Sequence, residues 1–291
     1  MFWRRLASRV PLVSAATVTV GGGGLGVCWL EEWRPPKFDP KKFPAPSYAG
    51  EVAIVTGGST GIGKATCKRL AEAGATVYNL DIAQPKEPTR ATWLSVDVRD
   101  VSAMRKAVDG IAAKHGRVDV LVSNAGIWAG GKLENVTESE YDMVLSINVK
   151  GAFFAIQSVL PVMRRRKSGS IILIGSDQSL VGKPEQNLYG MTKGALAQLA
   201  KSCAAEYASE GIRVNVVCPG TIDTPLMHGA VALFSAKRNV NKDDLYEWLQ
   251  TAQPFPRVGQ PEEVAALIAA IAKIPFVVGA SVAIDGGYTC Q

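Results

Sequence analysis

Histidine is nearly absent from this sequence of 291 residues, which contains only His115 and His228. A serine hydrolase needs a histidine base beside its nucleophile. Asp177 directly follows Ser176, as a hydrolase arrangement would allow, but His115 stands in a Lys-His-Gly pattern that ends a helix. The shortage of histidine therefore argues against Ser-His-Asp chemistry.

Cysteine is also scarce, and its five positions lack the close spacing of a metal site. The five residues are Cys28, Cys67, Cys203, Cys218 and Cys290. Scattered cysteines of this kind indicate buried thiols in a reducing compartment, and we expect no bound metal.

Positive charge outside the N-terminus is low. The net charge is +6, but residues 1–48 contain seven basic and three acidic side chains, so they contribute +4 of it. The excess of about +2 on the remainder is too small for a nucleic-acid-binding surface. We therefore expect no nucleic-acid partner.

Acidic residues are missing from the first thirty positions, which contain Arg4, Arg5 and Arg9. This composition is typical of a mitochondrial transit segment, and cleavage of such a presequence is the interpretation that we favour. The alternative is a membrane anchor, because Val10–Leu30 is an uncharged run long enough to cross a bilayer, flanked by tryptophans. Gly21–Gly24 would make it a poor helix, and a disordered tail is the third alternative.

Proline is concentrated in residues 34–46, which contain five prolines and favour an extended linker. The sequence thus predicts three regions: residues 1–33 as a targeting or membrane-anchor segment, residues 34–48 as a basic proline-rich linker, and residues 49–291 as one globular domain.

Short apolar runs alternate with amphipathic helical patterns throughout residues 49–291, and no repeat is visible. The expected strands are 51–55, 75–80, 92–96, 119–123, 170–174, 212–217 and 281–284, and the expected helices include 103–114, 139–163, 194–210 and 262–272. This alternation predicts an α/β fold, a Rossmann-like doubly wound parallel sheet of about seven strands with helices on both faces.

A glycine-rich turn follows the first predicted strand and precedes a helix that ends near Ala73. In this position, backbone N–H groups and the N-terminus of the helix face a pyrophosphate. The predicted cofactor-binding residues of the turn are Gly57, Ser59, Thr60, Gly61, Ile62 and Gly63.

The second predicted strand leads into Asp81, about 20 residues after the glycine turn. A carboxylate here accepts hydrogen bonds from the adenosine ribose and repels a 2′-phosphate. Neither Ser59 nor Thr60 is basic. The sequence therefore favours NAD as the cofactor over NADP.

Ser176 follows a buried strand, and Tyr189 and Lys193 share one face of the next helix because they are four residues apart. A lysine beside a tyrosine favours phenolate. Lowering a phenol pKa from about 10 to about 7 needs about 4 kcal/mol, which one cation about 4 Å away supplies at an effective dielectric near 20. We therefore interpret Tyr189 and Lys193 as an acid/base unit.

Together these motifs resemble those of the short-chain dehydrogenase/reductase family over residues 49–288. The matching positions are Thr56-Gly57-x-x-x-Gly61-x-Gly63, Asp97-Val98, Asn124-Ala125-Gly126, Asn148, Ser176, Tyr189-x-x-x-Lys193, Pro219-Gly220 with Thr221 and Thr224, and Asp285-Gly286-Gly287. The order and spacing of the set are specific to that family.

The resemblance implies catalytic roles for Asn148, Ser176, Tyr189 and Lys193. Tyr189 would be the general acid/base, Ser176 would orient the substrate oxygen, and Lys193 would also bind the nicotinamide ribose. Asn148 would hold a water linked to Lys193. The remaining implied cofactor contacts are Asp97, Val98, Asn124, Ala125, Gly126, Pro219, Gly220, Thr221, Ile222 and Thr224. Structural alternatives stay open, since Asn148 could simply be satisfied by backbone and Asn124 could merely hold a turn.

The expected function is the interconversion of a small secondary alcohol and a ketone, with residues 225–255 as a lid and Gln178 or Lys183 as polar substrate contacts. The resemblance further implies a homodimer or homotetramer formed by the long helices. The alternatives are an NADPH-dependent 3-oxoacyl reductase and a non-catalytic, membrane-tethered binding module. The expected location is the mitochondrion, or a membrane anchored by residues 10–30.

Overall fold

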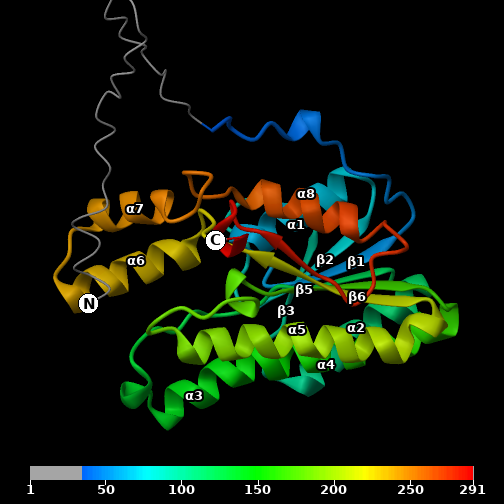
Figure 1. Cartoon of the computed structure of the whole chain (residues 1–291). Helices are drawn as coiled ribbons and strands as arrows, with labels where there is room; N and C mark the ends of the chain where they lie inside the picture. The colour runs from blue at the N-terminus through cyan, green and yellow to red at the C-terminus, as the bar shows by residue number, and fades with distance from the viewer. Residues whose placement is uncertain (1–34, 291) are drawn as a thin grey trace, which may run out of the picture. The chain divides into compact units, whose positions relative to one another are not determined.

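The computed structural model describes residues 35–290, and within them seven parallel strands form one sheet (Figure 1). The strand order is β3-β2-β1-β4-β5-β6-β7. Their bounds are Val52–Thr56 (β1), Thr76–Asp81 (β2), Thr92–Ser95 (β3), Val120–Ser123 (β4), Gly169–Ile174 (β5), Ile212–Pro219 (β6) and Ser281–Ile284 (β7). The predicted α/β fold is confirmed, because each apolar run pairs as a strand of this sheet.

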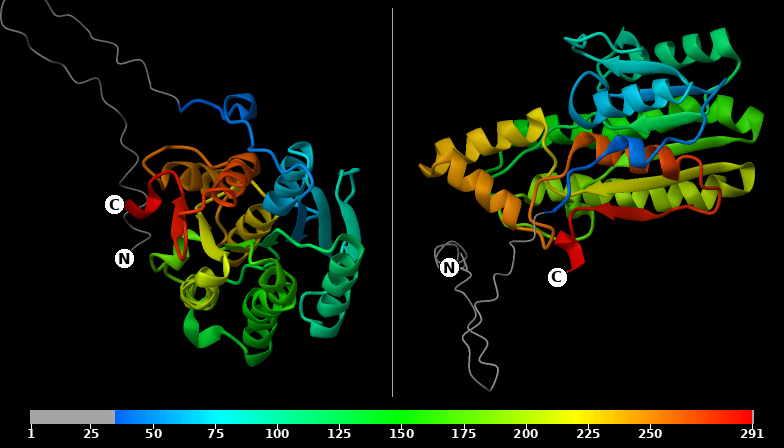
Figure 2. Two further views of the ribbon diagram at one scale, coloured as in Figure 1. Left: turned by 90° about the vertical axis from the view of Figure 1, so that its right-hand side faces the viewer. Right: turned by 90° about the horizontal axis from the view of Figure 1, so that it is seen from above.

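Helices cover both faces of the sheet (Figure 2). They are Gly61–Glu72 (α1), Val101–His115 (α2), Glu138–Leu145 (α3), Gly151–Arg166 (α4), Asn187–Tyr207 (α5), Pro225–Arg238 (α6), Lys242–Thr251 (α7) and Pro261–Ile271 (α8). Side chains of α2, α4 and α5 share one apolar core with the sheet, and those of α1 and α8 share the other. This two-sided cover explains why β1, β4 and β5 are buried along their whole length.

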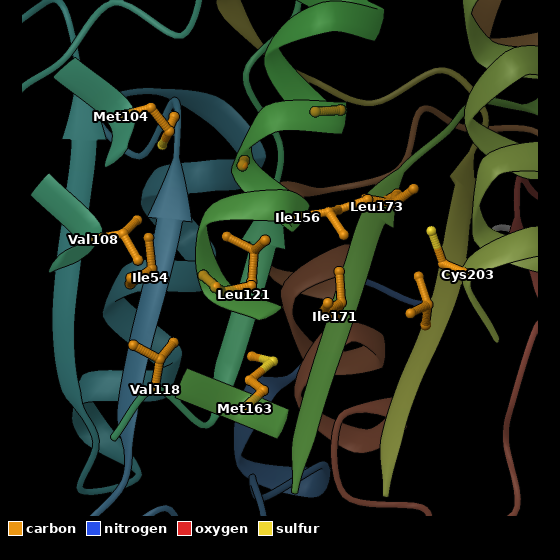
Figure 3. Close-up of a cluster of buried hydrophobic side chains, with 14 of the residues drawn as sticks. Ile54, Met104, Val108, Val118, Leu121, Ile156, Met163, Ile171, Leu173 and Cys203 are labelled. Atoms are coloured by element: carbon orange, nitrogen blue, oxygen red, sulfur yellow. The ribbon is translucent and has the colours of Figure 1, made fainter. Parts of the chain in front are cut away.

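The larger core joins parts of the chain that are far apart in sequence (Figure 3). Ile54 of β1, Leu121 of β4 and Ile171 of β5 meet Met104 of α2 and Ile156 of α4 there, and all five are nearly or fully buried. Burying each such side chain contributes about 1.5–3 kcal/mol. The core therefore fixes the carboxyl ends of these strands relative to one another.

The long helix predicted at 139–163 is interrupted by a π-helical turn at Ser146–Lys150, which separates α3 from α4. The combined segment Glu138–Arg166 is the one helix among the described residues with the length and hydropathy of a membrane span. Ala152, Ile156 and Val159 are buried against the sheet, so it is a core helix.

Residues 35–48, predicted as linker, include a short 3₁₀ turn at Pro40–Lys42, and residues from Lys37 onward belong to the compact unit. Tyr48 is fully buried, and its hydroxyl donates to the carbonyl of Ala269 at 2.6 Å. The predicted targeting segment, including residues 10–30, lies outside the described residues.

Candidate functional site: a nucleotide turn beside a serine, a tyrosine and a lysine

The glycine turn that the sequence predicted lies between β1 and α1, and it is closely packed. A Cβ atom on Gly63 would lie 2.1 Å from the carbonyl oxygen of Gly57, and Gly57 itself has a φ of +66°. Thr60 precedes α1 without a side-chain cap hydrogen bond. The first N–H groups of α1 therefore face the turn as a cradle for a phosphate anion.

Asp81 lies at the end of β2 beside this turn. Its carboxylate accepts hydrogen bonds from the backbone N–H of Ser59 at 3.0 Å and from that of Ala83 at 2.9 Å. One of its oxygens is therefore tied to the glycine turn itself. Asp81 thus ends β2 beside the glycine turn, and its contact with the ribose of a nucleotide stays a prediction.

Asn79 contributes to the turn and was missed by the sequence analysis. It is fully buried, its Oδ1 accepts from the N–H of Gly58 at 2.9 Å, and its Nδ2 donates to Ser59 Oγ at 3.0 Å. The sequence did contain a signal for this role, because Asn79 is an amide within a mostly apolar strand. A buried amide needs hydrogen-bond partners, and the adjacent turn can supply them.

Asn124 connects the end of β4 to the same turn. Its Nδ2 donates to the carbonyls of Thr56 at 3.0 Å and Gly57 at 2.9 Å. The hydroxyl of Thr56 accepts from the N–H groups of Asn124 and Ala125. These contacts fit the structural alternative for Asn124, in which its side chain holds a turn.

Two further groups of predicted cofactor residues flank the turn. The Cβ position of Gly61 is 3.2 Å from the methyl group of Thr224, so the segment from Pro219 through Gly220, Thr221 and Ile222 to Thr224 leads to the turn. Asp97 is engaged by the guanidinium of Arg99 at 2.6 Å, which lowers its carboxyl pKa. Val98 is buried, and its side chain approaches Gly151.

Ser176, Tyr189 and Lys193 gather after the carboxyl end of β5. Tyr189 and Lys193 lie in the first two turns of α5, and the ammonium of Lys193 is 5.4 Å from the centroid of the Tyr189 ring. A hydrogen bond links Tyr189 to Ser176. All three are buried, as an acid/base group shielded from bulk water requires.

The pKa of Tyr189 is raised above its ordinary value, and the expectation that Lys193 lowers it is wrong for this structure. Burial is the main cause and the charge of Asp177 is the second, while the bond to Ser176 acts in the opposite direction. The Lys193 ammonium instead donates to the carbonyl of Ile174 at 2.7 Å. Burial lowers the pKa of Lys193 to about 8, against a weaker opposing effect of Cys218.

Asn148 lies in the π-helical turn and faces the same centre. Its amide donates to the carbonyl of Ile127 at 2.9 Å and to Thr192 Oγ1 at 3.1 Å, and it accepts from the N–H of Ile127 at 2.9 Å. A Cβ on Gly126 would lie 3.3 Å from Asn148 Oδ1 and 3.7 Å from Lys193 Nζ. The absence of a side chain on Gly126 therefore leaves room for Asn148 and Lys193 beside its backbone. The hydrogen bonds of Asn148 in the structure are all with protein groups.

One side of the centre is formed by polar side chains from the segment between Ser176 and Tyr189, for which substrate contacts are predicted (the substrate side). Lys183 pairs with the buried carboxylate of Asp177 at 2.6 Å. Gln178 donates to Gln186 Oε1, which also accepts from Trp128 Nε1 at 3.1 Å. Gln178 and Lys183 are thus both placed near Ser176, and their contact with a substrate stays a prediction.

Helices α6 and α7 occupy the predicted lid region and form a hairpin that projects past the ends of the strands (Figure 1). They have an apolar core of their own around Met227, Val231 and Leu245. Phe234 of α6 contacts Trp128, with ring centroids 5.2 Å apart, and Arg238 pairs with Glu185. The hairpin therefore meets the substrate side of the centre through side chains.

Residues 35–290 contain no cluster of three or more potential metal ligands, and the absence of a bound metal stays a prediction. Asp285 accepts from the N–H groups of Gly287 and Thr289 at 3.0 Å. Asp285 therefore holds the C-terminal turn.

Comparison with known proteins supports an oxidoreductase. A family model described as enoyl-(acyl carrier protein) reductase matches residues 57–289. Cis-4-hydroxycyclohexanecarboxylate dehydrogenase of Sinomonas cyclohexanicum is 37% identical over 255 residues, which cover 84% of this chain and 98% of that protein. The 3-oxoacyl-[acyl-carrier-protein] reductase FabG of Thermotoga maritima is 34% identical over 250 residues, which cover 82% and 97% of the two chains.

Solved structures show the same fold. The ligand-free aldohexose dehydrogenase of Thermoplasma acidophilum superposes with a TM-score of 0.79 at 33% identity, over 84% of this chain and 95% of that one. ElxO, solved with NADP bound, superposes with a TM-score of 0.75 at 28% identity, over 83% and 99% of the two chains. The glycine turn, the serine-tyrosine-lysine centre and these matches together show that the chain belongs to the short-chain dehydrogenase/reductase family of NAD(P)-binding oxidoreductases.

Proposed function

We propose that this protein interconverts a secondary alcohol and a ketone by hydride transfer, with NAD as the preferred cofactor and Tyr189 as the general acid/base. The observation that carries the proposal is the convergence of Ser176, Tyr189 and Lys193 at the carboxyl end of β5. This centre lies on the same edge of the sheet as the glycine turn, because parallel strands end together.

Ser176, Tyr189 and Lys193 have separate roles in the proposed proton transfer. A bound nicotinamide nucleotide supplies the hydride acceptor or donor. Ser176 holds the substrate oxygen, and Tyr189 gives it a proton or takes one from it. Lys193 uses one N–H for Ile174, which leaves two donors of an ammonium for a ribose. The raised pKa of Tyr189 keeps it protonated at neutral pH, as the acid of ketone reduction requires.

The preference for NAD rests on Asp81. Its carboxylate is held at the end of β2 by the N–H groups of Ser59 and Ala83. A carboxylate fixed there accepts hydrogen bonds from ribose hydroxyls and repels a 2′-phosphate. ElxO, a structural neighbour, was solved with NADP bound, so the proposed preference for NAD rests on Asp81 of this chain and not on that neighbour.

Titration of NADH and NADPH against the intrinsic fluorescence of the full chain tests the proposal. NADH should bind more tightly, Asp81→Ala should lose the preference, and Tyr189→Phe should keep binding but lose turnover. If neither nucleotide binds at a concentration near millimolar, the enzyme proposal fails and a non-catalytic binding module takes its place.

The substrate class can be tested with two matched alcohols. Cis-4-hydroxycyclohexanecarboxylate, taken from the name of a relative, carries the secondary alcohol together with a carboxylate, whereas cyclohexanol lacks the carboxylate. If Lys183 contacts an anionic substrate, Lys183→Ala should raise KM for the acid and leave KM for cyclohexanol unchanged. An unchanged KM for the acid removes that role.

A second candidate is an NADPH-dependent 3-oxoacyl reductase, which the similarity to FabG favours. Asp81 is the feature that opposes it. Reduction of a 3-oxoacyl thioester with NADPH, faster than any alcohol oxidation with NAD, would establish this alternative.

We also propose a homodimer or homotetramer formed through α3, α4 and α5. Tyr141, Met143, Phe153 and Met191 of these helices are each 42–47% exposed. Apolar side chains gathered on neighbouring helices are typical of a subunit interface. Light scattering of the full chain tests this proposal, and a monomer would contradict it.

For the location, we propose that residues 1–33 direct the chain to the mitochondrion. A fluorescent protein fused behind residues 1–48 should reach mitochondria and lose the segment by cleavage. An uncleaved fusion that resists alkaline extraction from membranes would favour the anchor formed by residues 10–30 instead.

A further inference from the structure

Asp177 carries a buried carboxylate next to the catalytic centre. The proposed proton transfer by Tyr189 assigns no role to this carboxylate. Its side chain is only 3% exposed. One oxygen accepts the hydroxyl proton of Ser176 at 2.8 Å, and the other accepts from the ammonium of Lys183 at 2.6 Å. Removing a carboxylate from water is costly unless it is paired, so these two contacts account for its burial.

Lys183 is fixed in turn by the C-terminal segment. Its ammonium lies 4.0 Å from the centroid of the Tyr288 ring, and its side chain is 17% exposed. An ammonium over an aromatic face is attracted by the ring quadrupole. Lys183 is therefore held between Asp177 and Tyr288.

The Ser176 hydroxyl has a single proton, and its orientation follows from this pairing. Because the hydroxyl donates to Asp177, its oxygen is left to accept hydrogen bonds, and it accepts one from the N–H of Gln178 at 3.2 Å. Ser176 is also hydrogen-bonded to Tyr189. The Ser176 oxygen is thereby held in place beside Tyr189, and the hydrogen bond between them lowers the pKa of the Tyr189 phenol.

We propose that Asp177 and Lys183 act together as positioning residues for Ser176 and Tyr189. The Asp177 carboxylate accepts the hydrogen bond that the Ser176 hydroxyl donates, and Lys183 offsets the negative charge that Asp177 brings to the tyrosine. This inference rests on the proposed alcohol and ketone chemistry. It adds that Asp177 and Lys183, which lie outside the set of Ser176, Tyr189 and Lys193, control the pKa of Tyr189.

The charged and titratable groups around Tyr189 come from four parts of the chain. They are Asp177 and Lys183 from the preceding segment, Lys193 from α5, Cys218 from β6 and Tyr288 from the C-terminal turn. Burial raises the pKa values of Cys218 and Tyr288, so both are neutral near pH 7. Asp177 is thus the anion of this set, and Lys183 is its direct partner.

The test compares the pH profiles of kcat/KM for cyclohexanol oxidation by the full chain with NAD. Oxidation needs the tyrosine as a base, so kcat/KM should rise with pH through the Tyr189 ionisation. Lys183→Met leaves Asp177 uncompensated and should move the midpoint up by on the order of one pH unit, the effect of one nearby charge. Asp177→Asn should move it down, and the double variant should lie near the wild type.

Two controls separate positioning from a general structural effect. Lys183→Arg keeps the charge and should restore the wild-type midpoint, and Lys132→Met removes the charge of an exposed lysine that lies 3.9 Å from Glu134. A midpoint that is unchanged in Lys183→Met, or that moves the same way in both single variants, would overturn the inference.

A second measurement is independent of turnover. The ultraviolet absorbance of tyrosinate, taken as the difference between each variant and the same variant carrying Tyr189→Phe, reports the ionisation of Tyr189 directly. In Asp177→Asn, Tyr189 should ionise at a lower pH than in the wild type. If the wild type oxidises no alcohol but this shift is seen, the proposed function fails while the inference stands; an unchanged ionisation contradicts the inference alone.

Discussion

The nucleotide half and the substrate half of the site are built from different kinds of contact. Around the glycine turn, short side chains bond to backbone groups. Asn79 and Asn124 bond to backbone atoms of the turn, and the Thr56 hydroxyl accepts from the N–H of Asn124, directly after β4. On the substrate side, long side chains bond to one another, as in the pairs Lys183 with Asp177 and Arg238 with Glu185.

This difference has a physical consequence. Long side chains lose more rotamer freedom when they are ordered, so their contacts stabilise less in net terms than those of buried amides and glycines. We therefore expect the nucleotide half to tolerate little change and the substrate half to be adjustable by single substitutions.

The largest expected effect concerns Lys193, which serves both halves. Burial lowers its pKa from 10.5 to about 8, so the unfolded chain binds more protons between these values and folding stability rises with pH there. Across that pH window the unfolding free energy of the wild type should rise by about 3 kcal/mol relative to that of Lys193→Met.

Urea unfolding at several pH values from about 7 to about 10.5 measures this difference. Lys132→Met is the control for removing a lysine from the surface. A wild-type advantage over Lys193→Met that stays constant across the window would contradict the prediction.

The next largest effect concerns the glycine turn. Gly63→Ala would bring a Cβ to within 2.1 Å of a backbone carbonyl, which must then move. We expect the unfolding free energy to fall by about 1–3 kcal/mol and the Kd for NADH to rise about tenfold or more. Nucleotide titration and thermal unfolding measure the two effects.

Gly110→Ala is the matched control, because Gly110 lies within α2 and a Cβ there would meet no atom within 4 Å. It should raise the unfolding free energy by about 0.5–1 kcal/mol and leave nucleotide binding unchanged. Equal losses in the two variants would show that the turn has no special packing requirement.

Two buried asparagines sharpen the comparison further. Asn79 and Asn215 are both fully buried in strands and both bond to backbone, but only Asn79 contacts the glycine turn. Each change to Leu should cost about 1–3 kcal/mol by leaving buried partners unpaired. Only Asn79→Leu should weaken NADH binding; a similar loss of binding in Asn215→Leu would contradict this.

The smallest expected effect lies on the substrate side. Glu185→Gln removes the charge that pairs with Arg238 of α6, and both side chains are partly exposed. Stability should change by less than about 1 kcal/mol, while KM for the alcohol should rise because the contact between the hairpin and the segment before α5 is weakened. Glu134→Gln, in an exposed pair, is the control. An unchanged KM would remove the link between this contact and substrate binding.

Much of the nucleotide half could be predicted from sequence because its requirements are local. The glycine turn, the strand before it and Asp81 follow one another along the chain, and each is recognised by its residue type. Tyr189 and Lys193 were likewise predictable, since helical periodicity alone places them on one face.

The electrostatics of the centre were less predictable. The spacing of Tyr189 and Lys193 suggested a lowered tyrosine pKa, but their environment raises it through burial and Asp177. Desolvation depends on everything that packs around a group, and no local pattern reports it. The π-helical turn that places Asn148 was also missed, since neither proline nor glycine stands at Ser146–Lys150.

The sequence by itself determined the strands, the helices that pack on the sheet and the glycine turn, because hydrophobic periodicity and backbone freedom act over a few residues. Only the tertiary structure decided which distant groups meet: Asn79 with the turn, Lys183 with Tyr288, and the linker's Tyr48 with Ala269. These contacts depend on how whole elements pack across the sheet, and packing joins residues that no local pattern connects.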